Sequence, residues 1–204
     1  MQHRKFAEIV TPELAGDAII NDEFPGFRED YLVLHSLIRV HLRDTFPLRS
    51  VRFLEIGTNV GTGTNIIYNA LIRRGCRKCG KKKRYEPTVF TMDLPLQDAH
   101  VSLQHPGNRT GNRIKFDVKQ IYANSMEFDY KTIYPLDGAW IDAEHTYDNV
   151  LHESRAMQEA GCHLIAWHDT DIDEVFKAVK DAINEDRYNI YRVEDTRITY
   201  AIKK

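Results

Sequence analysis

The sequence predicts an α/β fold in which a mostly parallel β-sheet is covered by helices on both faces. Short apolar runs of strand length alternate with segments that place apolar side chains at helical spacing along most of the 204 residues. Strands that alternate with helices in this way form parallel sheets, which need a helical layer on each face. A chain of this length can bury a full core, so we expect one domain that spans residues 1–204.

The first elements are a helical segment and a buried strand. Residues 1–47 are predicted to form an N-terminal helical segment, because apolar side chains recur at helical spacing between Arg28 and Thr45 and Pro47 closes the pattern. Val51–Ile56 is short, apolar and followed by glycine, which predicts a strand buried in the sheet.

The rest of the chain continues this alternation. Each predicted strand is short and apolar, and each predicted helix carries its apolar residues on one side. The expected helices are Thr62–Arg74, Asp148–Glu159 and Asp173–Ile183, and the further strands are Val89–Met92, Ile121–Ala123, Asp137–Ile141, Cys162–Trp167, Asn189–Val193 and Arg197–Ile202. We therefore expect a seven-stranded sheet whose last two strands form a C-terminal antiparallel hairpin.

The composition excludes several classes of protein. With 42% hydrophobic and 28% charged residues, the chain is neither disordered nor fibrous. A formal net charge of -2 makes nucleic acid an unexpected partner. Three cysteines favour a reducing compartment over a disulfide scaffold. No segment has the pattern of a signal peptide or a membrane span, so we expect a cytoplasmic protein, and the composition is compatible with a homo-oligomer.

Polar clusters follow four of the predicted strands. These clusters are Gly57–Gly63, Asp93, Asp142–His145 and His168–Asp169. In open parallel sheets a ligand binds beyond the carboxyl ends of the strands. The clusters therefore predict a binding site at that edge of the sheet.

The first cluster is a glycine-rich loop between a strand and a helix, Glu55–Thr64. Glycine permits positive φ and lets a ligand approach the backbone closely. The glycine spacing is G-x-x-x-G-x-G rather than the G-x-G-x-x-G of dinucleotide sites, and Glu55 stands two positions before the first glycine. A carboxylate there suits a cationic amino group better than a pyrophosphate, which argues against a nicotinamide oxidoreductase.

At this point the sequence resembles the class I S-adenosylmethionine-dependent methyltransferases. The closest similarity is to the branch that contains small-molecule and sugar O-methyltransferases of antibiotic pathways. The motifs EIGTNVGTGT, IDAEHTY and AWHDT occur in the order of that family within about residues 50–175. The resemblance implies a three-layer Rossmann-like methyltransferase fold, S-adenosylmethionine as cofactor and a small-molecule acceptor.

The resemblance also implies a set of cofactor-binding residues. Glu55 and Gly57 are expected at the amino acid end of the cofactor, Asp93 at the ribose hydroxyls and Asn124–Ser125 at the adenine. The full expected set is Glu55, Gly57, Thr58, Asn59, Gly61, Thr64, Asp93, Ser125 and Asp142. An ordinary strand-to-helix turn is the alternative for the glycines, and a solvated strand end is the alternative for Asp93.

The two later clusters suggest a metal ion and a base. In the antibiotic-sugar methyltransferases, acids at the positions of Asp142 and Asp169 bind a divalent ion, and several members have a second acid where this chain has His168. We therefore expect Asp142, His168 and Asp169 to bind magnesium or a similar ion that lowers the pKa of a substrate hydroxyl. His145 and Glu144 are the two candidates for the base, and the sequence does not separate them. The alternatives are a helix start for Glu144–His145 and a buried structural pair for His168–Asp169.

One segment departs from a compact strand-helix-strand unit. Residues 76–87, CRKCGKKKRYEP, resemble an inserted basic loop, because the next acid, Asp93, comes later than the usual spacing of about 20 residues. A basic loop supports a second hypothesis, a phosphate-rich or macromolecular acceptor, although such runs are usually solvated surface. Cys76 and Cys79 are only half of a zinc site. A third hypothesis is a module that binds the cofactor without catalysis.

Overall fold

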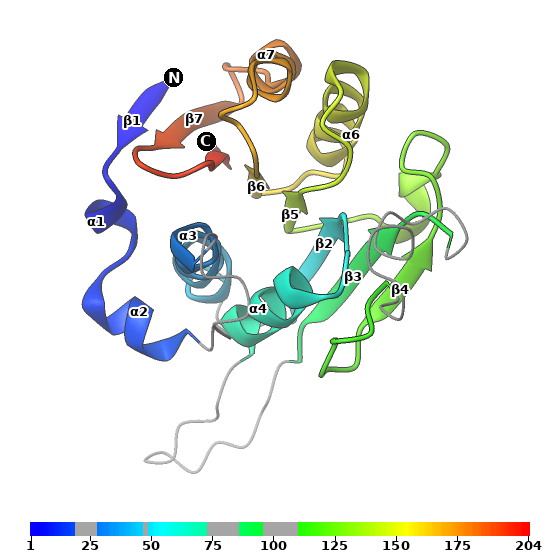
Figure 1. Ribbon diagram of the computed structural model, residues 1–204, viewed down its shortest axis with the longest axis horizontal. Helices are drawn as coiled ribbons and strands as arrows, with labels where there is room; N and C mark the ends of the chain where they lie inside the picture. Colours follow the sequence, from blue (N-terminus) through cyan, green and yellow to red (C-terminus); the bar gives the residue numbers. More distant parts are fainter. Residues whose placement is uncertain (19–27, 47–48, 73–85, 96–109) are drawn as a thin grey trace.

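The protein is a three-layer α/β structure built on one mixed sheet (Figure 1). The computed structural model describes residues 1–18, 28–46, 49–72, 86–95 and 110–204. These residues form an eight-stranded sheet in the order β1-β7-β8-β6-β5-β2-β3-β4. Every pair of neighbouring strands is parallel except the two that involve β8, which is antiparallel to β6 and β7. The predicted fold class is confirmed, including its C-terminal antiparallel pair.

The predicted helices and strands all occur, with small differences at their ends. The strands are β1 (Gln2–Arg4), β2 (Arg52–Ile56), β3 (Thr88–Asp93), β4 (Lys119–Tyr122), β5 (Gly138–Ile141), β6 (Leu164–Trp167), β7 (Tyr188–Val193) and β8 (Thr199–Lys203). The helices are α1 (Phe6–Ile9), α2 (Pro12–Asp17), α3 (Arg28–Ile38), α4 (Thr62–Leu71), α6 (Tyr147–Glu159) and α7 (Asp173–Ala182), with a π-helical turn η2 (Arg39–Arg43) and a 3-10 turn η3 (Tyr130–Ile133).

The sheet has one strand more than the seven that were predicted. The additional strand, β1, lies in the segment predicted to be helical, pairs in parallel with β7 and forms one edge of the sheet. All three of its residues are exposed, so it joins the sheet through its backbone and not through a buried face. A strand without an apolar face leaves no alternating pattern in the sequence, which explains why it was missed.

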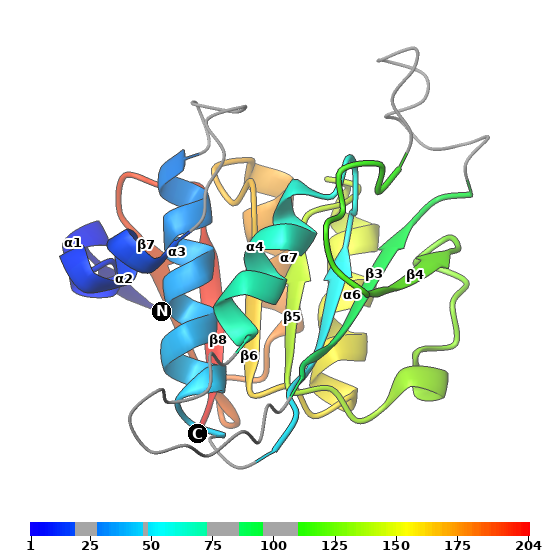
Figure 2. The same ribbon diagram turned by 90° about the horizontal axis from the view of Figure 1, so that it is seen from below.

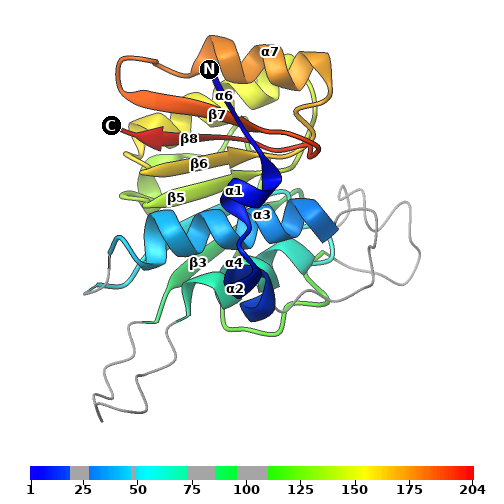
Figure 3. The same ribbon diagram turned by 90° about the vertical axis from the view of Figure 1, so that its left-hand side faces the viewer.

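Helices cover both faces of the sheet. Helices α3 and α4 pack together on one face, and α6 and α7 pack together on the other, as Figure 3 shows. The short helices α1 and α2 lie outside α3, at the end of the molecule away from β4 (Figure 2).

The central strands are buried on both faces, as strands of a parallel sheet must be. In β5, Trp140 packs into the core beneath α3 and α4, whereas Ala139 and Ile141 pack beneath α6 and α7. The neighbouring strand β6 alternates in the same way. Continuous apolar runs such as these are typical of strands with helices on both sides.

Parts of the predicted features lie outside the described residues. These are residues 76–85 of the basic loop, with both of its cysteines. Within the described parts of the chain, no helix has the length and apolar character needed to cross a membrane.

Candidate active site

The register of the central strands brings the predicted clusters to one edge of the sheet. Ile56 at the end of β2 is paired with Met92 of β3 on one side and with Ile141 of β5 on the other. Ile141 is in turn paired with Trp167 at the end of β6. The residues that follow these four strands therefore lie side by side.

The glycine loop, residues 57–61, crosses the end of β2 in a conformation that requires glycine. Gly57 and Gly61 have φ values of 99° and 95°, and Asn59 between them has a φ of 47°. A Cβ atom on Gly57 would lie 1.9 Å from the main-chain oxygen of Asp142. The loop thus lies against the end of β5, and two of its glycines are fixed by geometry and not only by the need for a turn.

Glu55 lies beneath this loop in a shell of hydroxyl groups. Its carboxylate accepts hydrogen bonds from the Oγ1 atoms of Thr64 and Thr91, the latter at 2.6 Å, and its exposed fraction is 1%. Thr58 Oγ1 lies 2.5 Å from Thr91 Oγ1 and extends the network to the loop. Burial raises the pKa of Glu55 to about 8, although the two threonine hydrogen bonds act in the opposite direction.

Asp93 is held at the end of β3 by two backbone amides. Its Oδ2 accepts from the amide of Asn59 at 2.8 Å, and its Oδ1 accepts from the amide of Leu94 at 2.8 Å. The side chain therefore joins the glycine loop to β3 in a fixed orientation, and the alternative of a merely solvated strand end does not describe it.

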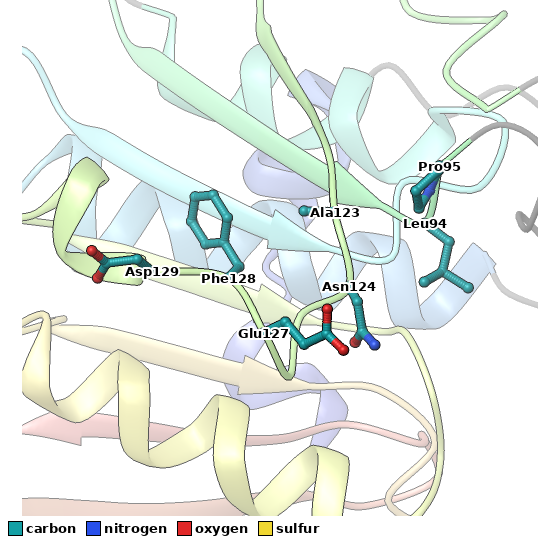
Figure 4. A pocket seen from close by; sticks show the side chains of 7 residues that line it. All are labelled: Leu94, Pro95, Ala123, Asn124, Glu127, Phe128 and Asp129. Atoms are coloured by element: carbon teal, nitrogen blue, oxygen red, sulfur yellow. The ribbon is translucent and has the colours of Figure 1, made fainter.

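A cavity of about 700 Å³ opens beside Asp93, at the carboxyl ends of β3 and β4. Figure 4 shows the residues that line it: Leu94, Pro95, Ala123, Asn124, Glu127, Phe128 and Asp129. Its volume falls within the range of small-ligand sites, about 300–1,000 Å³. Of the predicted pair at the adenine, Asn124 lines the cavity, whereas Ser125 is buried and does not.

The second part of the site is a group of charged side chains after β5 and β6. His168 Nδ1 lies 3.1 Å from Asp142 Oδ1 and 3.1 Å from Asp169 Oδ2, and the three groups can present one ligand atom each within 4.8 Å of one another. His145 Nε2 lies 2.9 Å from Asp169 Oδ2, whereas Glu144 is exposed. The structure therefore brings His145, but not Glu144, against the acidic group.

The electrostatics of this group are dominated by contacts between imidazoles and carboxylates. Burial lowers the pKa of His168, but the hydrogen bonds that its imidazole donates to Asp142, Asp169 and Asp30 outweigh this effect and raise the pKa to about 11. Burial raises the pKa of Asp169, but its contacts with His145 and His168 hold it well below the ordinary value. The contact with Asp169 also raises the pKa of His145. The carboxylates therefore favour the positively charged forms of His145 and His168.

Two residues of this network were not predicted from the sequence. Asp30 of α3 lies 3.1 Å from His168 Nε2, and Arg197, just before β8, contacts both Asp30 and Asp169. Asp30 is 4% exposed. In the sequence it looks like an ordinary acid in the first turn of a helix, and nothing local marks its distant partners.

The group of Asp142, His168 and Asp169 fits a divalent metal ion. Ligands that share an ion at about 2.1 Å lie about 3 Å from one another, close to the 3.1 Å contacts of His168 Nδ1. Two carboxylates suit a hard ion such as magnesium, and the imidazole extends the range to manganese, iron or zinc. The donor set agrees with a metal site.

Comparisons with known proteins found similar folds among solved structures but no similar sequence family. Neither a protein-family model nor a curated protein sequence matches the chain. A methyltransferase from Podospora anserina bound to S-adenosylhomocysteine aligns with 94% of this chain and 86% of its own, with 13% identity and a TM-score of 0.56. The O-methyltransferase from Bacillus cereus in complex with S-adenosylhomocysteine aligns with 97% and 90%, with 15% identity and a TM-score of 0.54. The chain has a methyltransferase fold.

A third similar structure carries a metal. The MycE methyltransferase of the mycinamycin pathway, in complex with magnesium and S-adenosylhomocysteine, aligns with 81% of this chain and 48% of its own. Its identity to this chain is 14% and the TM-score is 0.51. The fold predicted from the resemblance is therefore confirmed.

Proposed function

We propose that the protein is an S-adenosylmethionine-dependent methyltransferase that methylates a hydroxyl group of a small molecule with the help of a divalent metal ion. The observation that carries this proposal is the placement of two sites side by side on one edge of a methyltransferase fold. The glycine loop and Asp93 form one, and Asp142, His168 and Asp169 form the other. Similar solved structures bind S-adenosylhomocysteine, and one also holds magnesium.

The cofactor residues have separate tasks in this proposal. Asp93 is held by backbone amides at the end of β3, next to Leu94 of the cavity wall, where it would bind the ribose hydroxyls. The cavity would take the adenine, with Asn124 at its wall. Glu55, Gly57, Thr58, Asn59, Gly61 and Thr64 would shape the loop around the amino acid end, with Glu55 acting from beneath it. Ser125, which is buried, would support the neighbouring residue Asn124 at the adenine.

The residues after β5 and β6 would prepare the acceptor. Asp142, His168 and Asp169 would hold the ion, which would favour the deprotonated form of a substrate hydroxyl. His145 is the better candidate for the base, because its imidazole is held by Asp169 beside these residues whereas Glu144 is exposed. The methyl group would then pass from sulfur to the substrate oxygen with loss of the hydroxyl proton.

The choice of acceptor follows from the metal residues. An ion with oxygen and imidazole ligands suits a neutral hydroxylated molecule whose hydroxyl group can reach it. The alternative of a phosphate-rich or macromolecular acceptor depended on the basic loop, most of which lies outside the described residues.

Calorimetric titration with S-adenosylhomocysteine tests the cofactor assignment. We expect micromolar binding by the wild type and a loss of at least tenfold in Asp93→Ala, because the ribose would lose its acceptor and the loop its anchor. Asp44→Ala is the matched control, because Asp44 is a 56% exposed acid remote in sequence from the loop. No binding by the wild type would overturn the proposal.

A turnover assay tests the reaction. The purified protein, S-adenosylmethionine and a panel of catechols, sugars and glycosides would be incubated with magnesium or manganese, and mass spectrometry would detect products heavier by one methylene. Turnover is expected to require the ion and to fall at least 100-fold in Asp169→Asn. Equal turnover in excess chelator would contradict the role of the metal.

A further inference from the structure

We propose that Asp30, in helix α3, is a positioning residue that fixes the orientation and tautomer of His168 for metal binding. This inference rests on the proposed metal site and adds a residue to it that has no sequence motif. It also gives α3 a role in assembling the active site.

Asp30 is buried and its contacts are directional. Oδ2 lies 3.1 Å from His168 Nε2 and also accepts from Arg197 Nη2 at 2.7 Å and Arg197 Nε at 3.0 Å. Oδ1 accepts from the backbone amide of Arg197 at 3.1 Å. The carboxylate is thus held by four donors from two residues. One of these donors is the imidazole of His168, which is a proposed metal ligand.

The Asp30 contact decides which nitrogen of His168 faces Asp142 and Asp169, the other two proposed metal ligands. A carboxylate only accepts hydrogen bonds, so Nε2 carries the hydrogen in this contact. The other nitrogen, Nδ1, faces Asp142 Oδ1 and Asp169 Oδ2, each at 3.1 Å. A metal ion bound there would replace the Nδ1 hydrogen and leave the remaining hydrogen on Nε2, where Asp30 accepts it. A histidine that binds a metal through one nitrogen and donates to a carboxylate through the other has its ring orientation and tautomer fixed by that carboxylate.

Arg197 connects Asp30 to Asp169, a second proposed metal ligand. Its Nη1 donates to Asp169 Oδ1 at 3.0 Å, while the rest of the guanidinium holds Asp30. Asp30 and Arg197 therefore orient His168 and Asp169 together. A purely structural pair between α3 and β8 would not need the Oδ2 atom of Asp30 to face an imidazole nitrogen.

Manganese binding to the intact protein tests the inference in Asp30→Asn and Glu29→Gln. Glu29 is the neighbouring exposed acid of α3, so its variant controls for the loss of one negative charge from this helix. We expect Asp30→Asn to weaken manganese binding by about 10–100-fold, the usual effect of losing such an outer partner, and Glu29→Gln to change it less than about twofold. Binding of S-adenosylhomocysteine should stay within a few-fold of wild type in both variants, which shows that each is folded.

The outcomes separate this inference from the proposed function. Unchanged manganese affinity in Asp30→Asn would overturn the role of Asp30 and leave the methyltransferase proposal standing. Absence of manganese binding by a wild type that still binds S-adenosylhomocysteine would overturn both the metal site and the role of Asp30.

A second measurement keeps the inference testable if Asp30→Asn does not fold. Long-range ¹H–¹⁵N spectra of the magnesium-loaded wild type should show the hydrogen of His168 on Nε2. A hydrogen on Nδ1 would overturn the inference without any variant.

Discussion

At the scale of single residues, Gly57 has less room for a side chain than Gly61, the other glycine of the loop. A side chain there meets both an unfavourable φ of 99° and the main-chain oxygen of Asp142 at 1.9 Å. Gly161, which ends α6, has a similar φ of 84° but nothing within 4 Å of an added Cβ. A comparison of alanine substitutions at the two glycines therefore separates the cost of backbone strain from the cost of a steric clash.

We predict that Gly57→Ala lowers the free energy of unfolding by at least about 3 kcal/mol, because strain and overpacking add. Gly161→Ala should cost only about 1–2 kcal/mol, since strain acts alone. Urea unfolding of the two variants checks this difference. Equal losses would show that the end of β5 moves away from the loop without cost.

Glu55 makes stability depend on pH. Its pKa is raised from an ordinary 4.5 to about 8 in the folded protein, so the folded state binds more protons than the unfolded state between these values. The Glu55 contribution to the free energy of unfolding therefore falls as pH rises from about 5 to 8, with a slope of at most about 1.4 kcal/mol per pH unit.

The matching variant is Glu55→Gln, which keeps the size of the side chain but cannot ionise. We predict that the difference in unfolding free energy between wild type and Glu55→Gln shifts against the wild type as pH rises from 5 to 8, as measured by urea unfolding at each pH. Parallel curves for the two proteins would mean that Glu55 titrates near its ordinary pKa.

At the scale of elements, the contact between α3 and the start of β8 depends on one buried ion pair. Arg197 donates to Asp30 through its side chain and its backbone amide, and Asp30 is 4% exposed. Removal of the arginine leaves a buried carboxylate with His168 as its remaining charged partner. Breaking a buried pair costs about 3–5 kcal/mol, and the partial exposure of Arg197 reduces this.

We predict a loss of about 2–3 kcal/mol of unfolding free energy in Arg197→Met, measured by urea unfolding. The control is Arg4→Met, which removes an ion pair with Glu8 in which both side chains are more than two-fifths exposed, and should cost less than about 1 kcal/mol. A loss below 1 kcal/mol in Arg197→Met would show that α3 is held by its apolar contacts alone.

The same contact shows what the sequence could and could not predict. Asp93 ends a short apolar strand, and Asp142, His168 and Asp169 come just after two others, so local pattern and the geometry of parallel sheets placed them at one edge. Asp30 meets His168 and Arg197 across most of the chain, and neither its neighbours nor its helix position distinguishes it from a solvated acid. Such contacts depend on tertiary packing.

Thr91, by contrast, marks its buried polar partner in the sequence. It is a polar residue in the middle of the apolar strand β3, it is 1% exposed, and it donates to Glu55 at 2.6 Å. A buried hydroxyl in a central strand needs a partner, so its presence indicates a polar group on a neighbouring strand. Strand β1 offered no comparable signal, because all its side chains are exposed.

At the scale of the whole molecule, the site consists of two halves that meet where β2 pairs with β5. Strands β2, β3 and β4 carry the glycine loop, Asp93 and the cavity, whereas β5 and β6 carry Asp142, His168 and Asp169. The halves touch where Gly57 packs against the backbone of Asp142. Their side chains form separate hydrogen-bond networks, one around Glu55 and Thr91 and the other around His168 and Asp169.

Separate networks predict separable ligand binding. In Asp169→Asn we expect manganese affinity to fall at least tenfold while S-adenosylhomocysteine affinity stays within about threefold of wild type, because a metal ligand is lost and the glycine loop is untouched. In Asp93→Ala we expect the reverse. Calorimetric titration of each variant with each ligand gives the four affinities. If either substitution weakens both ligands tenfold, the two halves are energetically coupled through the Gly57–Asp142 contact, and the cofactor and the ion would have to be treated as one cooperative site.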